Sequence, residues 1–216
     1  ELPKNVINHQ KNRVDHIIRL HEKKTIKPKI NKLEKYFQRK DILPLILQQR
    51  DDIFSYKQPK YIIFDSFSEL TDQRFRHKND GWEFFSNYAD ILHGDDFNNT
   101  FECLGLLSID EIEKYYDILF SLLNQTYNNV AIIFLHFPTI LDKREKFNLR
   151  GKGILNSIDQ LSYRIENLYS FDVPETIVGW PKSKVSIGLE DFPYHYNSET
   201  YQYLIELVSS KLYKQR

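Results

Sequence analysis

The chain has 216 residues, enough for one well-buried domain and too few for two large ones. Lys plus Arg and Asp plus Glu both number 30, so the formal net charge is zero and composition gives no case for nucleic-acid binding by the chain as a whole. The single cysteine, Cys103, excludes a disulfide within this sequence and a cysteine-based metal cage, and its apolar neighbours predict a buried position.

The balanced total hides a basic N-terminal segment. Residues 1–50 contain 13 Lys or Arg against 5 Asp or Glu, whereas the remaining residues contain 17 against 25. The segment could face an anionic ligand, a phosphate or the acidic remainder of the chain, and helix faces docked on an acidic body are the favoured interpretation. Residues 8–52 are predicted to be helical, with Pro28 between two helices and Pro44 either opening or kinking a further one.

A short apolar run at residues 61–64 is rich in strand-forming residues and predicts a buried parallel strand. The acids, hydroxyls and arginine of residues 65–74 follow at once, as expected where such a strand delivers side chains to a functional edge. Residues 76–100 lack a clear period and contain Asn79-Asp80-Gly81, so this stretch is predicted to be a loop that could cover a site.

The second half of the chain alternates helices and strands. Ser108 and Glu111 have the spacing of a capping box, which predicts the start of an amphipathic helix that ends near Gln125. Strands are predicted at residues 130–135 and, more weakly, at 176–178. Two further helices are defined by their apolar residues, namely Ile154, Ile158, Leu161, Ile165 and Leu168 for the first, and Tyr201, Leu204, Ile205, Val208 and Leu212 for one that begins near Asn197 or Ser198.

This alternation predicts an α/β fold, a three-layer α/β/α sandwich with a mainly parallel sheet. The predicted organisation is a basic helical extension over residues 1–52 packed on a core domain over residues 53–216. Because ligands bind outside the carboxyl ends of parallel strands, residues 65–74, residues 136–139 and the tail around His195 are expected to meet. Their hydroxyls, carboxylates and two histidines suit acid–base or nucleophilic chemistry.

Two short motifs resemble the SGNH/GDSL hydrolase superfamily. The segment Phe64-Asp-Ser-Phe-Ser-Glu69 is similar to its strand-end Gly-Asp-Ser block, and Asp191-Phe-Pro-Tyr-His195 is similar to the Asp-x-x-His pair before its last helix. Phe64 stands where the superfamily has glycine, and one extra residue separates the acid from the histidine. The resemblance implies an SGNH-like, flavodoxin-like fold with Ser66 as nucleophile, His195 as general base and Asp191 orienting the imidazole.

The sequence resembles more closely a group of uncharacterised SGNH-like proteins of bacterial capsule and polysaccharide loci. Their strand-following block resembles Asp72-Gln-Arg74 and their tail resembles Pro193-Tyr-His-Tyr196, so that the resemblance covers roughly residues 59–210. On an alignment to this group, a Gly-Ser-Cys block on an earlier strand carries the nucleophile, which then lies outside the given sequence, and Ser66 is an ordinary serine at a strand end. The resemblance implies a serine esterase or O-acetyltransferase that acts on carbohydrate in cell-surface polysaccharide biosynthesis.

The catalytic candidates also have structural interpretations. Ser66 can cap the helix after its strand, Asp191 can cap a helix or form a turn, and His195 can hydrogen-bond to its own loop. If these interpretations hold, the chain is a noncatalytic glycan-binding or scaffolding protein. A basic partner-binding arm on an inert domain is a third possibility.

Four residues are candidates for substrate binding, namely Asp65, Glu69, Arg74 and His136. Arg74 can bind a carboxylate or phosphate through two hydrogen bonds, although pairing with Asp72 or Glu69 competes with this. His136 at a strand tip is a better candidate for ligand contact than for catalysis.

No cofactor and no metal are expected, because the sequence has no Gly-rich phosphate loop, no dinucleotide fingerprint and no zinc-like spacing of histidines. The expected partner is a carbohydrate or an acylated small molecule, not nucleic acid. No apolar run approaches the ~18 residues that a membrane span needs. Without a signal-peptide pattern, a cytoplasmic location is the default expectation, and the sequence makes no prediction of the oligomeric state.

Overall fold

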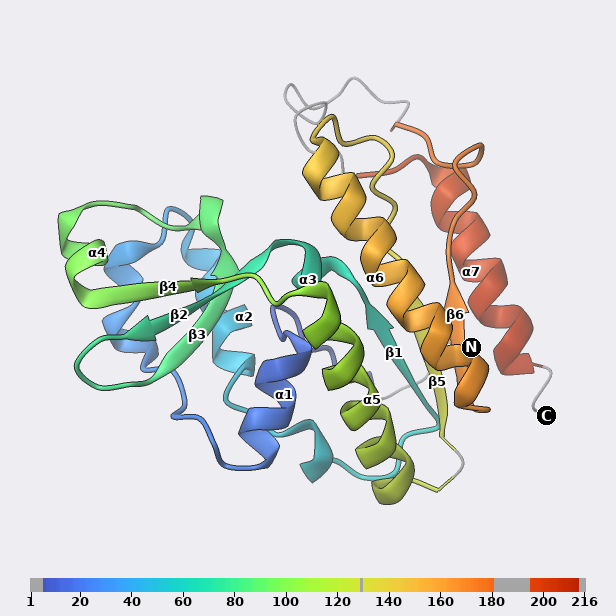
Figure 1. Ribbon diagram of the computed structural model, residues 1–216, viewed down its shortest axis with the longest axis horizontal. Helices are drawn as coiled ribbons and strands as arrows, with labels where there is room; N and C mark the ends of the chain where they lie inside the picture. The colour runs from blue at the N-terminus through green and yellow to red at the C-terminus, as the bar shows by residue number, and fades with distance from the viewer. Residues whose placement is uncertain (1–5, 129, 181–194, 214–216) are drawn as a thin grey trace. The chain divides into compact units, whose positions relative to one another are not determined.

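The computed structural model describes residues 6–128, 130–180 and 195–213 and shows a mixed α/β protein (Figure 1). The chain divides into two compact units, of which unit 1 comprises residues 1–58 and 71–128, and unit 2 comprises residues 59–70 and 129–216. The α/β class predicted from the sequence is thereby confirmed. The predicted division into a helical extension and a core domain after residue 52 remains a prediction. The two compact units are divided at other positions in the chain.

The helices and strands follow one another in this order along the chain: α1 (Val14–His21), α2 (Leu43–Gln48), β1 (Tyr61–Asp65), α3 (Phe67–Thr71), β2 (Asp72–His77), β3 (Glu83–Asn87), α4 (Asp95–Thr100), β4 (Phe101–Gly105), α5 (Ile109–Thr126), β5 (Ala131–Leu135), α6 (Glu145–Arg164), β6 (Leu168–Phe171) and α7 (Ser198–Tyr213). None of the helices in the described ranges is long and apolar enough to cross a membrane.

Unit 1 is built on an antiparallel sheet with the strand order β3-β2-β4. Gly81, in the turn between β2 and β3, has a φ of +71°, a conformation that favours glycine. The prediction of a loop over residues 76–100 is therefore wrong, since this stretch contains β3 and α4. The four residues Glu83–Ser86 are all buried, so that β3 shows none of the alternation by which a half-exposed strand is recognised.

A cluster of buried apolar side chains, mostly aromatic, forms the core of unit 1: Leu33, Tyr36, Phe37, Ile42, Ile46, Phe75, Trp82, Phe84, Ile91, Phe97 and Phe101. Five of these come from the basic N-terminal segment, which is only partly helical. It contains α1, α2 and short 3-10 turns in place of the long helices predicted for residues 8–52. Pro44 lies in the first turn of α2, which confirms that it opens a helix.

The helix α5 follows the sequence prediction closely. Ser108 Oγ accepts a hydrogen bond from the Glu111 N–H, and the Ser108 N–H donates to Glu111 Oε2 at 3.1 Å, so the capping box is formed. The helix ends at Thr126. Cys103, in contrast, is exposed on β4 and donates to Gln73 Oε1, so the prediction that it is buried is wrong. In β4 only the residue at the start of the strand is fully buried.

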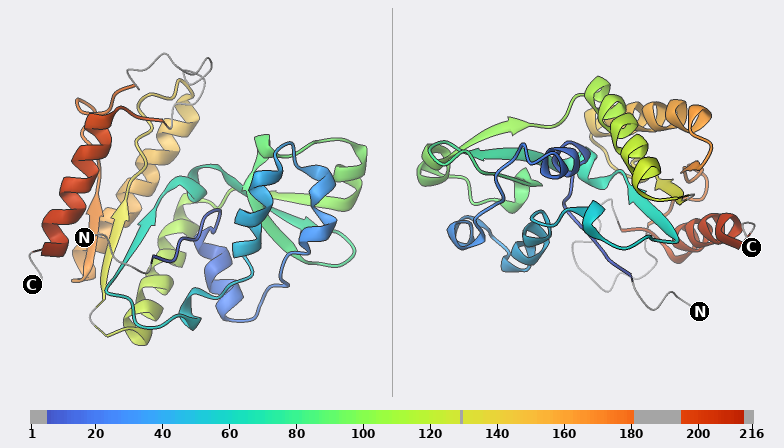
Figure 2. Two further views of the ribbon diagram at one scale, coloured as in Figure 1. Left: turned by 180° about the vertical axis from the view of Figure 1, so that it is seen from behind. Right: turned by 90° about the horizontal axis from the view of Figure 1, so that it is seen from below.

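Unit 2 is built on a parallel sheet with the strand order β1-β5-β6. Helices α6 and α7 lie on opposite faces of this sheet, as Figure 2 shows from two directions. Two contacts agree with this arrangement. Ser170 of β6 donates to Asp159 of α6, whereas its neighbour Tyr169, whose side chain points to the other face, lies under Lys211 of α7.

The third strand of this sheet is displaced from its predicted position. It is β6, Leu168–Phe171, and residues 175–177 form a turn, so the strand predicted at 176–178 is wrong. The predicted helix through Ile165 and Leu168 instead ends at Arg164. An apolar residue at the start of a strand can continue a helical pattern by chance. Pairing with β5 places Leu168 in a strand and not in the helix.

Helix α7 begins at Ser198 as predicted. Of the side chains predicted to face inward, Tyr201 and Ile205 are exposed, whereas Leu204, Val208 and Leu212 are half-buried.

Candidate functional site

The candidate site lies at the carboxyl end of the parallel sheet in unit 2. Asp65, Leu135 and Phe171 are register partners at the last positions of β1, β5 and β6. The backbone ladder continues for one residue, because the Ser66 N–H donates to the Leu135 carbonyl at 3.2 Å and the His136 N–H donates to the Phe171 carbonyl at 2.8 Å. Ser66 and His136 therefore sit side by side at the edge where parallel sheets bind ligands.

Ser66 joins the end of β1 to the start of α3. Its carbonyl accepts the Leu70 N–H at 3.1 Å, which begins the helix, and its hydroxyl oxygen accepts the Phe137 N–H at 2.8 Å. Only 3% of its surface is accessible. The serine thus follows its strand as a nucleophile would, and at the same time makes a bond that ties the loop after β1 to the loop after β5.

Asp65 lies immediately before Ser66 and keeps solvent contact. Its Oδ1 accepts the Phe67 N–H at 2.8 Å, a local bond that stabilises the turn into α3. The protein atoms around its carboxyl group desolvate it and raise its pKa, while the Phe67 N–H acts in the opposite direction. This carboxylate therefore takes up a proton more readily than an ordinary aspartate.

His136 begins a chain of three hydrogen-bonded side chains. Its Nε2 lies 2.8 Å from Ser170 Oγ, and the Ser170 hydroxyl donates to Asp159 Oδ1 at 2.5 Å. His136 is buried, with 4% of its surface accessible. Desolvation lowers its pKa to about 4, although Asp159 acts in the opposite direction, so the imidazole is neutral at pH 7.

The tail joins the same edge through Tyr196. Its hydroxyl donates to the Pro138 carbonyl at 2.5 Å, and its ring packs on Phe137 with the centroids 5.4 Å apart. Phe137 in turn packs on Phe67 at 4.9 Å. Burial raises the pKa of Tyr196, which keeps this donor protonated. The prediction that the segments after β1 and β5 meet the tail is confirmed for these residues.

Of the two remaining triad candidates, His195 and Asp191, the structure describes only the first. His195 is exposed and directly precedes the anchored Tyr196. Asp191 lies outside the described residues. The assignment of Ser66, His195 and Asp191 as a catalytic triad stays a prediction.

Glu69 and Arg74, both candidates for substrate binding, lie in different units. Glu69 is buried in unit 2, where its backbone carbonyl accepts two hydrogen bonds from the Arg150 guanidinium, at 2.8 and 2.6 Å. Arg74 lies on β2 in unit 1 and pairs with Glu83 at 2.5 Å. The prediction that Arg74 pairs with Asp72 or Glu69 is wrong, because β3 lies next to β2 and brings Glu83 across the sheet.

Three polar residues at this edge were missed in the sequence, namely Asp159, Ser170 and Asp172. Asp172 follows β6, and desolvation is the main cause that raises the pKa of its carboxyl group. A strand placed at residues 168–171 would have pointed to Ser170 and Asp172, because both lie at its carboxyl end. Asp159 has no signal of its own in the sequence, since it lies within α6.

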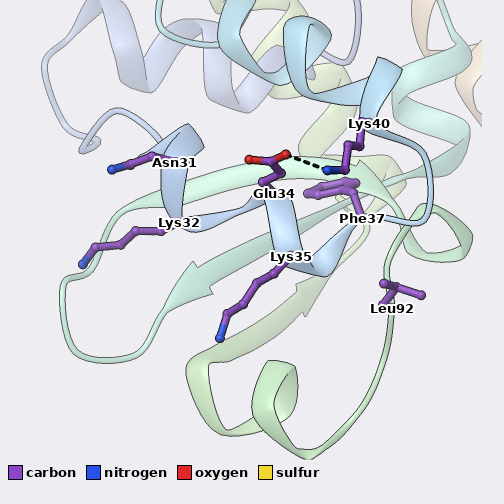
Figure 3. A pocket seen from close by; sticks show the side chains of 7 residues that line it. All are labelled: Asn31, Lys32, Glu34, Lys35, Phe37, Lys40 and Leu92. Carbon is purple, nitrogen blue, oxygen red and sulfur yellow. Dashed lines mark hydrogen bonds and ion pairs between the residues drawn. The ribbon is translucent and has the colours of Figure 1, made fainter.

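The basic residues of unit 1 face acidic side chains of the same unit. A hollow of about 710 Å³ is lined by seven residues that Figure 3 draws, namely Asn31, Lys32, Glu34, Lys35, Phe37, Lys40 and Leu92. The three lysines that line it are paired, Lys32 with Asp80 at 3.0 Å, Lys35 with Asp96 at 2.5 Å and Lys40 with Glu34 at 2.8 Å. These pairs weaken the case for an anion site there, and the docking of the basic segment on an acidic body stays a prediction.

Within the described ranges, no group of three or more His, Cys, Asp or Glu residues is arranged to hold a metal ion. The chemistry available at the strand ends of unit 2 is therefore that of a serine hydroxyl, a neutral imidazole, two carboxyl groups whose pKa is raised by desolvation, and aromatic rings. No protein-family model, curated protein or solved structure matches the chain.

Proposed function

We propose that the protein is an SGNH-like serine esterase or O-acetyltransferase that acts on carbohydrate, in the cytoplasm, as part of cell-surface polysaccharide biosynthesis. The observation that supports this best is the contact between Tyr196 and the loop after β5. It anchors the tail that carries His195 to the strand end at which Ser66 lies. The parallel sheet with helices on both faces supports an SGNH-like three-layer fold.

In the proposed reaction, Ser66 Oγ attacks the acyl carbonyl carbon while His195 accepts the hydroxyl proton. The tetrahedral intermediate collapses, the leaving alkoxide takes that proton from His195, and the acyl group stays on Ser66. Water or a sugar hydroxyl then attacks the acyl-serine while giving its proton to His195. Ser66 recovers the proton on release of the acid or the acylated sugar, and Asp191 orients the imidazole throughout.

A second candidate function is a noncatalytic glycan-binding protein. It is favoured by the burial of Ser66 and by the bond that its Oγ accepts from the Phe137 N–H. Together these give the serine a sufficient structural role, which is to connect the loops after β1 and β5.

Labelling of the intact chain with a fluorophosphonate probe, followed by mapping of the modified residue, separates the two candidates. An enzyme that uses the proposed triad is labelled at Ser66, and the label is lost in Ser66→Ala and strongly reduced in His195→Ala. Ser68→Ala is the matched control, because Ser68 lies two residues further along and has no proposed role. Absence of labelling in the folded wild-type chain would count against the enzyme, and a label on a serine outside the given sequence would favour the alternative alignment.

A further inference from the structure

The chain of hydrogen bonds through Ser170 determines which nitrogen of His136 carries the proton. A serine hydroxyl has one hydrogen, and Ser170 gives it to Asp159 Oδ1. Ser170 Oγ can then only accept from His136 Nε2, which must be an N–H. The neutral ring therefore has Nδ1 as its unprotonated nitrogen, with a lone pair available to accept a hydrogen bond.

Nothing among the described residues donates a hydrogen bond to this nitrogen. The side-chain hydrogen bond of His136 is the one through Nε2, and its ring otherwise contacts the Phe134 ring at 5.0 Å between centroids. Among the described residues, Nδ1 of His136 is not one of the buried polar atoms that lack a partner, so it is accessible to a donor from water or a ligand. The lowered pKa of His136 keeps this nitrogen unprotonated near neutral pH, so that it stays an acceptor.

We propose that His136 Nδ1 accepts a hydrogen bond from a hydroxyl group of a bound carbohydrate, and that Ser170 and Asp159 are positioning residues that hold the ring in the tautomer this requires. The inference rests on the carbohydrate part of the proposed function and is independent of catalysis by Ser66.

The surroundings of His136 select a hydroxyl donor. The strand ends on either side carry Asp65 and Asp172, whose carboxylates are hydrogen-bond acceptors and disfavour an anionic ligand. The rings of Phe67 and Phe137, both partly exposed, lie along the same edge and offer apolar surface, whereas the ring of Tyr196 that packs on Phe137 is buried. Acceptors beside aromatic rings suit a neutral molecule with many hydroxyl groups, since such a molecule has polar edges and apolar faces.

The tautomer is tested by two-bond proton–nitrogen correlation NMR of the full chain labelled with ¹⁵N-histidine, with His136→Phe used to assign the resonance. We expect an unprotonated Nδ1 and a protonated Nε2 in the wild type at pH 7. Ser170→Ala should mix the tautomers, and Ser170→Thr, which keeps the hydroxyl, should restore the wild-type pattern. A protonated Nδ1, or no change in Ser170→Ala, would overturn the assignment of the positioning residues.

Ligand binding is tested in the same spectra with methyl α-D-glucopyranoside and N-acetylglucosamine as probes. A hydroxyl that donates to Nδ1 shifts the ¹⁵N resonance of this nitrogen while leaving the resonance of Nε2 nearly unchanged. Methyl tetra-O-methyl-glucopyranoside, which has the same ring and no hydroxyl donor, should not shift it, and neither should inorganic phosphate. His136→Phe is expected to weaken sugar binding by about three- to tenfold, the value of one hydrogen bond.

The results distinguish this inference from the proposed catalytic function. If neither sugar shifts Nδ1, or if the O-methylated probe or phosphate shifts it as much as the sugars do, the carbohydrate contact is wrong even where Ser66 is labelled by the fluorophosphonate. A sugar-dependent shift of the Nδ1 resonance without labelling of Ser66 supports the contact between His136 and carbohydrate and argues against esterase activity. A purely structural hydrogen-bond chain would fix the tautomer but leave Nδ1 insensitive to sugar.

Discussion

His136 illustrates how one buried residue takes its properties from three elements. The ring follows β5, its partner Ser170 lies on β6, and the terminal acceptor Asp159 lies on α6. Burial keeps the imidazole neutral, and the serine defines its tautomer. Each of these effects depends on groups that are distant in the sequence, so that His136 alone, read as a histidine at a strand tip, predicts only ligand contact.

The stability of the protein should depend on His136 at acidic pH. The folded pKa of about 4 lies below the ordinary value of 6.5, so between these pH values the unfolded chain binds a proton that the folded chain does not. The free energy of unfolding therefore falls as the pH drops from 6.5 to 4, by roughly 3 kcal/mol in total for this group. Urea denaturation at several pH values should show a shallower fall in His136→Phe than in the wild type.

His136→Phe also loses the bond to Ser170, and for this reason the comparison concerns the slope with pH and not the stability at pH 7. Parallel pH profiles for the two proteins would contradict the neutral, buried state of the imidazole.

At the scale of single elements, the sequence predicted helix caps correctly but did not predict which strands pair. The helix α5 begins where Ser108 and Glu111 predict, because both capping bonds join residues three positions apart. The strand β3 was missed, because its burial on both faces removes the alternating pattern. Only the first residue of β6, Leu168, was assigned to a helix, since it continued the apolar spacing of α6.

Removal of the cap should destabilise unit 1. Ser108→Ala leaves the Glu111 N–H without its acceptor and is expected to cost about 1 kcal/mol in the free energy of unfolding, measured by urea denaturation. Ser209→Ala in α7 is a matched control, because alanine is favoured over serine within a helix and the substitution should be neutral or slightly stabilising. Equal losses in both variants would contradict the capping role.

The whole molecule consists of two units with different sheets, one antiparallel with an aromatic core and one parallel with a polar strand-end edge. The basic N-terminal segment contributes apolar side chains to the first core, and its lysines pair with Asp80 and Asp96. The lysine pairs lower the pKa values of these two carboxyl groups. Charge asymmetry along the chain is thus neutralised largely within unit 1.

The two units should differ in their response to a cavity. Phe84 is fully buried in the core of unit 1, and Phe84→Ala is expected to destabilise that unit by about 3–5 kcal/mol. Hydrogen exchange followed by mass spectrometry should then accelerate more in peptides of β2, β3 and β4 than in those of β5. The same acceleration in both groups of peptides would show that the units unfold as one cooperative body.

The sequence by itself determined the features that depend on neighbouring residues: the apolar strands β1 and β5, the cap and length of α5 and the start of α7. It also placed Ser66 and His136 at strand ends, because an apolar run that stops abruptly marks the end of a strand. The burial predicted for β1 is wrong, since its residues are half-buried or exposed. Only the tertiary structure decided that Arg74 pairs with Glu83, that Tyr196 anchors the tail to Pro138, and that Asp159 reaches His136 through Ser170. Those contacts join residues that are distant in the sequence. Strand pairing and helix packing bring these residues together, and no local sequence pattern encodes that pairing or packing.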